Sequence, residues 1–493
     1  MAVTITGRDL TRDDLVRVAR DGEPVILDPE AVDRMATARR IVEERLRAGD
    51  AIYGGSTAVG VLKRAGVGSD DAGAYSGRMI RQHMVAQGDD APAELVRATM
   101  LRLANGLAAG YPGVRPVLAE RLVGALNSSD LPRIRILGSV GQSDLAQMAD
   151  LAASVFDGMA LEAGEGLALV SSNSFSTAAA ALAIADLWRL VACLEVAGAV
   201  SLEGLAGNPR SIDPGVGEAR PYPGLQASLA QIGRHLEGSA LHQAGVARAL
   251  QDPLSFRNLP QVMGACRDAL GHADDILAIE LNASQGNPIV LIDERRVIPA
   301  ANFEIMPLAA ALDYLRLVLS AALGASAERS VKLLETTWSG LPTGLATSGD
   351  PSDPGLSYLG IAAQAIAVEA RLLAAPVSNE IVSTAHAEGI EDRTSLAPLA
   401  ARRTTEMVAL GARVVALELA VATQAVELRA VGPQGRGTRQ ATEIVRRHLP
   451  SLTPGSTVPD VEPLVAAVRA GSFALSLDYE AGSRTVRSRD RAG

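Results

Sequence analysis

Long runs of alanine and leucine dominate the second half of this 493-residue chain. Both residues are strong helix formers, whereas the aromatic residues that favour strands make up only 3% of the sequence. Apolar residues recur there at the three-to-four spacing of a helix face, and each longer helix would span about 45 Å. Such helices must pack against one another and, we expect, against copies in other subunits. The spacing predicts three of them, at Leu308–Thr336, Leu356–Ala374 and Ala401–Ala430.

The first part of the chain predicts mixed structure instead. Short strands and amphipathic helices alternate there, and a Gly/Pro-rich stretch at Ser201–Pro223 marks a domain boundary. We expect a mixed N-terminal domain over residues 1–205, a long-helix bundle over 206–480 and a disordered tail over 481–493. The early elements are strands at Val3–Ile5 and Val25–Leu27, a helix cap at Thr11–Asp14, and helices at Pro29–Ala48, Gly77–Gln87, Glu94–Ala109 and Pro116–Leu126.

Charge and cysteine content exclude several classes of function. The net charge is −10 and no basic run interrupts the folded part, which argues against a nucleic-acid groove. Cys193 and Cys266 lie in apolar contexts, which indicates buried thiols in a reducing compartment rather than a disulfide or metal site. The most apolar helical run, Ser176–Val200, contains three charged residues and no signal peptide opens the chain. We expect a cytoplasmic protein that binds neither membrane nor metal.

A glycine-rich loop at Leu137–Met148 reads Leu-Gly-Ser-Val-Gly-Gln-Ser-Asp-Leu-Ala-Gln-Met. Glycines allow the positive φ angles of a tight turn, and Ser or Asp caps the free N–H groups of a helix that follows. By itself the pattern predicts a capped helix from Asp144 to Phe156 and no particular chemistry.

This loop resembles the signature of the aromatic amino acid ammonia-lyase and aminomutase family, which includes histidine and phenylalanine ammonia-lyases. The family has Ala-Ser-Gly before Asp-Leu-Ala, and that triplet cyclises into an electrophilic methylidene-imidazolone group. Here Gln142 stands at the alanine, Ser143 keeps the serine, and Asp144 follows directly because the glycine is missing. Cyclisation compresses the backbone in a way that glycine tolerates and a Cβ-bearing residue resists. We therefore predict that this cofactor does not form.

The segment Tyr53–Gly60 resembles the family's Tyr-Gly-x-Asn-Thr-Gly-x-Gly lid. In the family this tyrosine is the general base that removes the substrate's β-proton, so the resemblance gives that role to Tyr53. Counting without gaps from Tyr53 sets Gln82 and His83 on the family's substrate-selecting pair. A structural role on a helix is the alternative for His83.

Residues that serve the electrophile in the family are changed in this chain. Ser171 occupies the position of the supporting asparagine, and Asn173 lies two residues further on. The stretch Gln251–Arg257 resembles the family's Gln-Asp-x-Tyr-Ser-x-Arg, but Leu254 replaces the second catalytic tyrosine. Gln251 and Arg257 are kept, and a guanidinium fork such as that of Arg257 suits the substrate carboxylate.

Two further positions match the family. Phe303 ends an Ala-Asn-Phe segment whose phenylalanine packs near the electrophile in relatives. Glu391 lies in Glu388–Ser395, which resembles the family's Asn-Gln-Glu-Asp-His-x-Ser loop, and would face the substrate nitrogen or the electrophile. A solvated helix-capping acid is the alternative for Glu391.

The resemblance covers nearly the whole chain and implies a mainly α fold of the ammonia-lyase type. It also implies a homotetramer whose active sites are shared between subunits. A tyrosinate alone cannot remove an unactivated β-proton, because general-base help is worth only ~10²–10⁴-fold. We therefore expect Tyr53, Ser143 and Glu391 to act on an already activated carboxylate-bearing small molecule, by elimination, isomerisation or cyclisation. A conventional ammonia-lyase or aminomutase and a non-catalytic scaffold are the alternatives.

Overall fold

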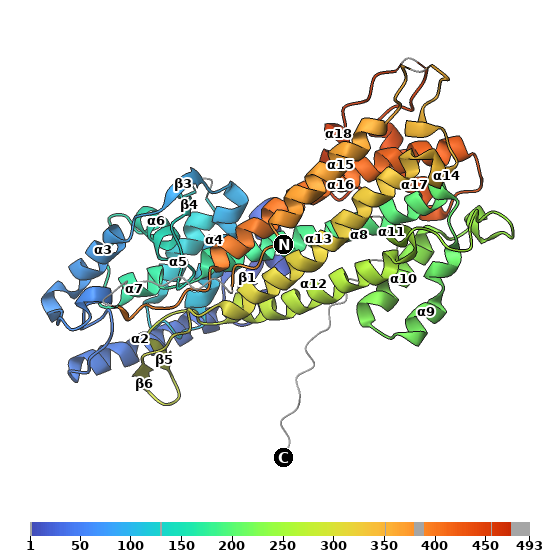
Figure 1. The fold of residues 1–493 in the computed structure, drawn as a ribbon. Helices are drawn as coiled ribbons and strands as arrows, with labels where there is room; N and C mark the ends of the chain where they lie inside the picture. The colour runs from blue at the N-terminus through green and yellow to red at the C-terminus, as the bar shows by residue number, and fades with distance from the viewer. Residues whose placement is uncertain (1, 129–130, 351, 379–388, 455, 475–493) are drawn as a thin grey trace. The chain divides into compact units, whose positions relative to one another are not determined.

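The computed structural model describes residues 2–128, 131–350, 352–378, 389–454 and 456–474. Helices account for most of the described residues, so the prediction of a mainly α fold is confirmed (Figure 1). The tail predicted over 481–493 lies outside the described residues. The strands pair in twos: β1 (Val3–Ile5) with β2 (Val25–Leu27) in parallel, and β3 (Gln87–Asp90) with β4 (Arg135–Leu137) and β5 (Ile289–Leu291) with β6 (Arg296–Ile298) antiparallel.

Eight α-helices precede residue 206 in the described part of the chain. They are α1 (Arg12–Val16), α2 (Pro29–Arg47), α3 (Ala72–Gln82), α4 (Ala93–Ala108), α5 (Pro116–Leu126), α6 (Leu145–Val155), α7 (Glu165–Val170) and α8 (Ser174–Leu205). The helices that follow are α9 (Pro214–Ala219), α10 (Pro223–His235), α11 (Leu254–Arg257), α12 (Leu259–Asn282), α13 (Met306–Leu334), α14 (Thr336–Ser339), α15 (Ser357–Leu372), α16 (Ala397–Arg429), α17 (Arg436–His448) and α18 (Glu462–Arg469).

Local sequence explains where several helices begin. Proline is the first residue of α2, α5, α9 and α10, where its missing N–H is not needed and its fixed φ suits the helix. Thr11 precedes α1 and forms a capping box, because its hydroxyl accepts from the Asp14 N–H while the Asp14 carboxylate accepts from the Thr11 N–H. The three long helices predicted in the second half are present as α13, α15 and α16.

The helix predicted at Gly77–Gln87 is displaced in the structure. Helix α3 spans Ala72–Gln82, and His83 follows it as the C-cap residue. Gln87 belongs instead to strand β3, where it pairs with Leu137 of β4. Gly88 has a φ of +82°, which a helix does not accept. Strand pairing with a segment 50 residues further along the chain therefore overrides the local helical pattern.

The chain divides into two compact units built from interleaved segments. Unit 1 comprises Met1–Trp188, Ala265–Gly324 and Ile366–Gly411, and unit 2 comprises Arg189–Gly264, Ala325–Ala365 and Ala412–Gly493. Helices α8, α12, α13, α15 and α16 each contribute residues to both units. The sequence instead predicts consecutive domains on either side of residue 205, which is where α8 ends.

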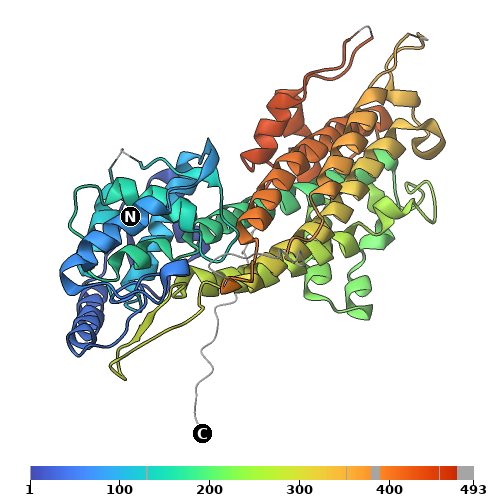
Figure 2. The ribbon, with the colours of Figure 1, turned by 60° about the vertical axis from the view of Figure 1, so that its left-hand side comes forward.

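A buried ion pair and a serine hydroxyl connect α8, α13 and α16 inside unit 2; the ribbons of these helices are drawn in Figure 2. The Arg329 guanidinium on α13 binds the Glu418 carboxylate on α16, with Nε 2.6 Å from Oε1. The Ser201 hydroxyl on α8 donates to the same carboxylate oxygen at 2.7 Å. Both charges are buried, so their mutual pairing and the added hydroxyl offset part of the cost of removing them from water.

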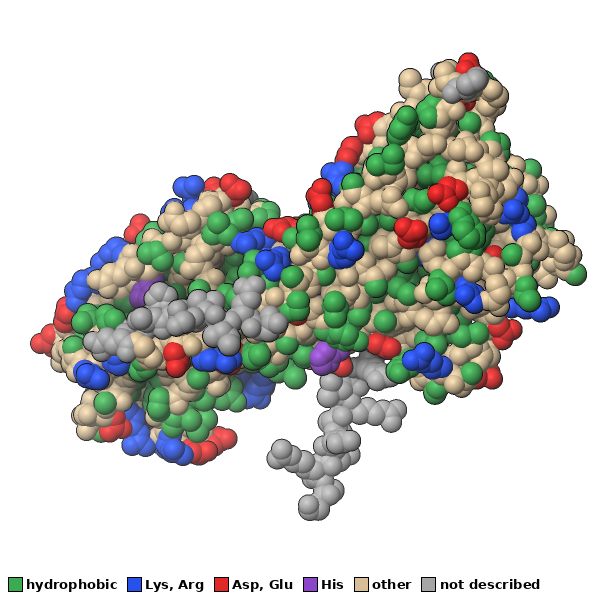
Figure 3. Space-filling model, viewed as in Figure 1, with side chains coloured by type: hydrophobic (Ala, Val, Ile, Leu, Met, Phe, Trp, Pro, Cys, Tyr) green, Lys and Arg blue, Asp and Glu red, His purple; other side chains and the backbone are tan. Residues whose placement is uncertain are grey.

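Cys193 and Cys266 are buried, as the sequence predicts. Burial raises the pKa of the Cys193 thiol to about 12, which keeps it protonated and unreactive. Two segments, Glu165–Leu205 and Met306–Leu334, are long and apolar enough to span a membrane by composition alone. Their most apolar windows are 72% and 56% buried, as in the core of a folded domain. On the described part of the face in Figure 3, acidic and basic side chains are interspersed.

Candidate functional site

The glycine-rich loop lies in unit 1 between strand β4 and helix α6. Gly138 and Gly141 have φ angles of +116° and +83°, which glycine adopts without penalty. A side chain at Gly141 would collide with the Ser395 hydroxyl and the backbone that follows it. Ser143 also has a positive φ, of 60°, although it carries a Cβ. A left-handed serine is uncommon and is held there only when surrounding contacts fix it.

Asp144 is the residue that ties this loop to helix α8. Its backbone occupies the N-cap position of α6, but its side chain does not cap that helix. The carboxylate instead accepts from the backbone N–H and the hydroxyl of Ser176, both at 2.7 Å, and from the Ser139 hydroxyl at 3.0 Å. Burial raises the pKa of Asp144 to about 6, because it outweighs these hydrogen bonds, which lower it. The predicted capping of α6 by a side chain is therefore wrong, and the first turn of α8 is capped instead.

The backbone and side chains at the triplet position make contacts outside the loop. The Asp144 N–H donates to the Ser172 carbonyl at 2.8 Å, and the Ser143 and Ser171 hydroxyl oxygens lie 3.1 Å apart. The Gln142 amide donates to the Glu304 carboxylate at 2.8 Å. Phe303, next to Glu304, is half-buried. The structure therefore brings the Ser143 and Ser171 hydroxyl groups together. Phe303 directly precedes Glu304, which Gln142 of the loop contacts.

Asn173 reaches the loop from the start of α8. Its amide nitrogen donates to the Gly141 carbonyl at 3.1 Å, and the Ser395 hydroxyl donates to the same carbonyl at 2.8 Å. The Asn173 side-chain oxygen is buried without a hydrogen-bond partner. An asparagine two residues beyond the expected position thus still supports the loop, while Ser171 contacts Ser143.

Tyr53 lies on the lid segment and its hydroxyl oxygen accepts from the Gly60 N–H at 2.9 Å. The side chain is half-buried. Burial raises the pKa of Tyr53, the Gly60 hydrogen bond lowers it, and the charges of Glu391 and Tyr75 raise it further. Glu391, the other predicted catalytic residue of this region, is exposed, and its charge disfavours ionisation of Tyr53.

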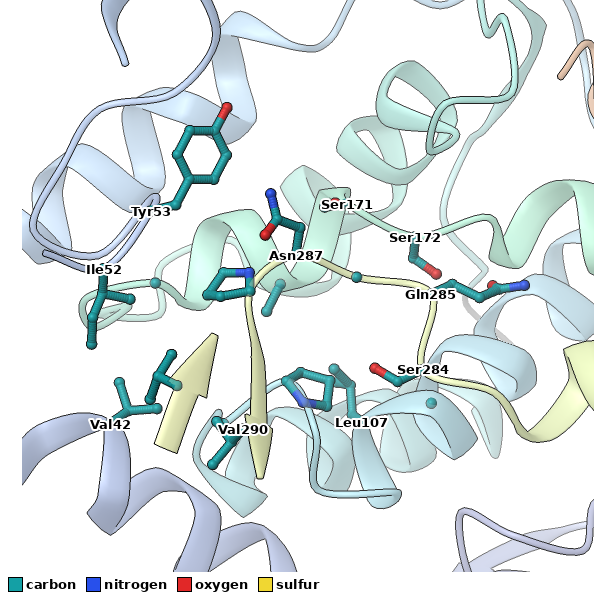
Figure 4. Close-up of a pocket in the computed structure, with 18 of the residues that line it drawn as sticks. Val42, Ile52, Tyr53, Leu107, Ser171, Ser172, Ser284, Gln285, Asn287 and Val290 are labelled. Carbon is teal, nitrogen blue, oxygen red and sulfur yellow. The ribbon is translucent and has the colours of Figure 1, made fainter. Parts of the chain in front are cut away.

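A cavity lies against the Tyr53 ring, entirely within unit 1 (Figure 4). The apolar side chains of Val42, Ile52 and Val290 gather on one side, and the Tyr53 hydroxyl points away from them. Ser284 and Gln285 lie on the opposite side, and each has a buried side-chain oxygen without a hydrogen-bond partner. The other lining residues include Arg102, Gly106, Ser171, Ser172, Gly286 and Asn287. The cavity thus presents polar groups that remain available to a ligand.

His83 and Gln82 end helix α3. The His83 Nδ1 atom lies 2.8 Å from the Met79 carbonyl, one turn back, so the ring caps its own helix. Gln82 is exposed and His83 half-buried. This arrangement matches the structural alternative for His83 and leaves its Nε2 atom outside that contact.

Gln251, Leu254 and Arg257 lie in unit 2, and all three are exposed. An Arg257 Nη1 hydrogen bonds to the Gln251 side-chain oxygen. Asp252 between them is buried, accepts from the Asn208 N–H at 2.6 Å, and its pKa is raised by burial. Arg257, the predicted carboxylate anchor, thus has its guanidinium at the surface of unit 2.

Sequence reasoning missed two buried or half-buried groups near the lid. Tyr75 on α3 accepts from the Val59 N–H at 3.0 Å. Arg102 on α4 lines the cavity, donates to the carbonyls of Glu280 and Ala283, and its pKa is lowered to about 10 by burial. Only the rarity of tyrosine in this sequence marks Tyr75. Among the described residues, no three His, Cys, Asp or Glu side chains gather as a metal site requires.

Comparisons with known proteins agree on one family. A family model described as aromatic amino acid lyase matches residues 10–158 and 155–447. A histidine ammonia-lyase of Caldanaerobacter subterraneus subsp. tengcongensis is 31% identical over 504 residues, covering 97% of this chain and 98% of that protein.

Two solved structures have the same fold. An ergothioneine-degrading ergothionase from Treponema denticola, in complex with desmethyl-ergothioneine sulfonic acid, aligns with a TM-score of 0.90 and 27% identity, over 96% of this chain and 99% of that one. A tyrosine aminomutase from Streptomyces globisporus aligns with a TM-score of 0.90 and 26% identity, over 96% and 98%.

Proposed function

Because this chain belongs to the aromatic amino acid lyase family, we propose that it is a lyase-like enzyme that works without the methylidene-imidazolone group. Tyr53 then carries the acid/base step on a carboxylate-bearing small molecule. Elimination, isomerisation and cyclisation are the reactions open to such a site. We also propose a cytoplasmic location.

The hydrogen bond made by the Asp144 backbone N–H is the observation that supports this proposal. Ring closure would require that nitrogen to attack the Gln142 carbonyl carbon, but its N–H donates to the Ser172 carbonyl at 2.8 Å. The Asp144 carboxylate is in turn held by Ser139 and Ser176. Moving the nitrogen toward Gln142 would break these contacts inside a buried site, where a lost hydrogen bond is costly. These residues do not fit the ring, and the proposed mechanism contains no step through it.

The proposed proton transfer uses the contacts of the lid. The Gly60 N–H stabilises negative charge on the Tyr53 oxygen, so the tyrosinate form has a fixed donor in place. Because the pKa of Tyr53 is raised, the neutral phenol dominates near pH 7 and the base form grows as pH increases. Activity that needs the base should therefore rise toward alkaline pH. The Ser143 and Ser171 hydroxyl oxygens lie 3.1 Å apart and supply two polar groups in place of the missing electrophile.

The missing electrophile restricts the substrate. An ordinary amino group leaves poorly, whereas a quaternary nitrogen leaves as a neutral amine without further activation. Ergothioneine, the compound degraded by the structural neighbour, is a betaine with such a nitrogen. Betaines of aromatic amino acids are therefore the first substrates to test, with histidine and tyrosine as comparisons. Arg257 offers paired donors for the carboxylate that all of these share.

We further propose that the enzyme is a homotetramer whose sites combine residues of several chains. Arg257 and Gln251 are exposed on unit 2 of a single chain, although a carboxylate anchor acts best when shielded from water. Large apolar side chains are also exposed on two long helices, Tyr314 and Leu317 on α13, and Tyr358 and Ile361 on α15. Apolar side chains grouped on helix faces in this way suit burial against further copies.

Intact mass and a substrate panel test the proposal. A mass equal to that of the unmodified sequence, with no extra near-ultraviolet absorbance, is the expected result. A deficit of two water molecules would instead show that the ring forms and would favour a conventional histidine-type ammonia-lyase. Turnover of a quaternary amino acid, followed by absorbance of the conjugated product, should exceed turnover of the parent amino acid. If no carboxylate is turned over or raises the melting temperature, the chain is a non-catalytic relative.

A further inference from the structure

Two consecutive amides of the lid each have a tyrosine as acceptor. The Val59 N–H donates to the Tyr75 hydroxyl oxygen at 3.0 Å, and the Gly60 N–H donates to the Tyr53 hydroxyl oxygen at 2.9 Å. The two amides belong to adjacent planar peptide units, which are connected only through the φ and ψ angles of Val59. Anchoring the Val59 amide to Tyr75 therefore limits where the Gly60 amide can lie.

Tyr75 is carried by a helix that is firmly seated. A Cβ on Gly166 of α7 would lie 2.5 Å from the Ser76 carbonyl of α3, so these two helices touch at their backbones. The Ser76 hydroxyl also donates to the Glu162 carbonyl at 2.9 Å. Close backbone packing leaves α3 little freedom to shift. The Tyr75 hydroxyl is thus a fixed point, whereas the segment Gly54–Gly60 contains three glycines.

The charged groups around the two phenols favour this arrangement near neutral pH. Burial raises the pKa of Tyr75, while the Val59 N–H and Arg78 lower it. Tyr53 is affected by Glu391 and Tyr75, both of which raise its pKa. A neutral Tyr75 accepts from Val59 without adding a negative charge beside Tyr53. An ionised Tyr75 would oppose formation of the Tyr53 base, since like charges repel.

We propose that Tyr75 is the positioning residue for Tyr53: by accepting from the Val59 N–H it anchors Val59, so that the next amide along the chain, the Gly60 N–H, faces the Tyr53 oxygen. This inference rests on the proposed acid/base function of Tyr53. The lid is then held by a tyrosine of the same chain, in a protein where the family's second catalytic tyrosine is replaced by Leu254. Tyr75 does not line the cavity and acts through Tyr53 alone.

The test uses the full chain with Tyr75→Phe, which removes the acceptor oxygen and keeps the ring. Tyr111→Phe is the matched control, because Tyr111 is an exposed tyrosine of the same unit. Hydrogen–deuterium exchange is measured on peptides covering residues 54–62. In Tyr75→Phe the Val59 and Gly60 amides should exchange about 10-fold faster, the effect of losing one hydrogen bond. The control should match the parent protein.

A second measurement reports directly on Tyr53. Proteins labelled with ¹³C at the tyrosine ring carbon that bears oxygen are titrated by NMR, with the Tyr53 signal assigned from Tyr53→Phe. The Tyr75→Phe variant should show a higher pKa for Tyr53, because loss of the Gly60 hydrogen bond, which lowers that pKa, outweighs loss of the smaller effect of Tyr75, which raises it. With a substrate that is turned over, the pH at which kcat rises should also be higher in Tyr75→Phe, while KM stays within about 2-fold of the parent value.

Three results would overturn the inference. The first is a finding on the parent protein alone: its Val59 and Gly60 amides exchange at the rate of an unprotected peptide. The second is a folded Tyr75→Phe variant that matches Tyr111→Phe in both exchange and the pKa of Tyr53. The third is Tyr53→Phe with undiminished turnover, which refutes the acid/base function but leaves the exchange and NMR results intact, so the two failures are distinguishable.

Discussion

Tyr53 combines partial burial with a backbone donor at its phenol oxygen, and the charge of Glu391 raises its pKa. Tyr53→Phe removes that oxygen and keeps the ring that lines the cavity. If the phenol moves the proton, kcat/KM should fall by about 10²–10⁴-fold with little change in substrate affinity. Steady-state kinetics on the substrate identified by the panel check this, with Tyr111→Phe as control. Equal rates for the two variants would refute the assigned role.

Asp144 should make stability depend on pH. Its pKa is raised from an ordinary 3.8 to about 6, so the folded state holds a proton that the unfolded chain has lost between these values. The contribution of this group to stability therefore falls as pH rises from about 4 to 6 and is constant above. Asp144→Asn lacks this titration and keeps an oxygen for the Ser176 N–H.

The melting temperature of Asp144→Asn, relative to the parent protein, should thus increase between pH 4 and pH 7. Two pKa units correspond to about 3 kcal/mol in the free energy of unfolding. Differential scanning calorimetry across this range provides the comparison, and Asp350→Asn, at an exposed loop carboxylate, serves as control. A difference between Asp144→Asn and parent that does not change with pH would show that the carboxylate stays charged in the fold.

The local sequence was sufficient to single out some of these residues and insufficient to single out others. Tyr53 and Ser143 belong to short segments whose order along the chain fixes their neighbours, so resemblance alone located them. The partner of Asp144 lies 32 residues away at Ser176, and no pattern between them predicts the contact. Tyr75 was missed for the same reason, because its significance comes only from the lid amide that it faces.

Among the elements, the contact of α3 with α7 is controlled by one glycine. Gly166→Ala would place a methyl group against the Ser76 carbonyl, and a backbone atom cannot move aside cheaply. Overpacking of this kind is worth about 1–3 kcal/mol, and we expect a corresponding fall in melting temperature. Gly124→Ala on α5 is the matched control, because a Cβ there meets nothing within 4 Å.

Gly124→Ala should stabilise the protein by about 0.5–1 kcal/mol, since alanine is the better helix former. Thermal unfolding of both variants, monitored by circular dichroism, gives the comparison. Similar melting temperatures would mean that α3 and α7 separate without cost, and that α3 is too loosely held to position Tyr75.

Helix positions were predictable to the extent that caps and prolines define them. The helix predicted at Pro116–Leu126 is present as α5, because a proline starts the helix and polar residues follow its last residue. Helix α3 was misplaced by five residues at each end because the pairing of β3 with β4 draws Gln87 into a strand. Long helices can be read from their periodicity, whereas two-stranded pairs depend on partners that a single sequence does not reveal.

At the scale of the whole molecule, the assigned residues fall into two groups. Tyr53, Ser143, Ser171 and Glu391 belong to unit 1, while Gln251 and Arg257 are exposed on unit 2. The proposed homotetramer would join a Tyr53 from one chain with an Arg257 from another. An enzyme built in this way is inactive as an isolated chain and depends on assembly for its chemistry.

Mixed assemblies test this arrangement. Tyr53→Phe removes the acid/base group and Arg257→Ala the carboxylate anchor, so each variant alone should lose most activity. Co-expressed chains that assemble at random would have both native residues in about a quarter of the sites, if each site draws them from two subunits. Activity of the purified mixed tetramer should therefore recover to that fraction. A site confined to one chain would show no recovery, because every chain would carry one of the two defects.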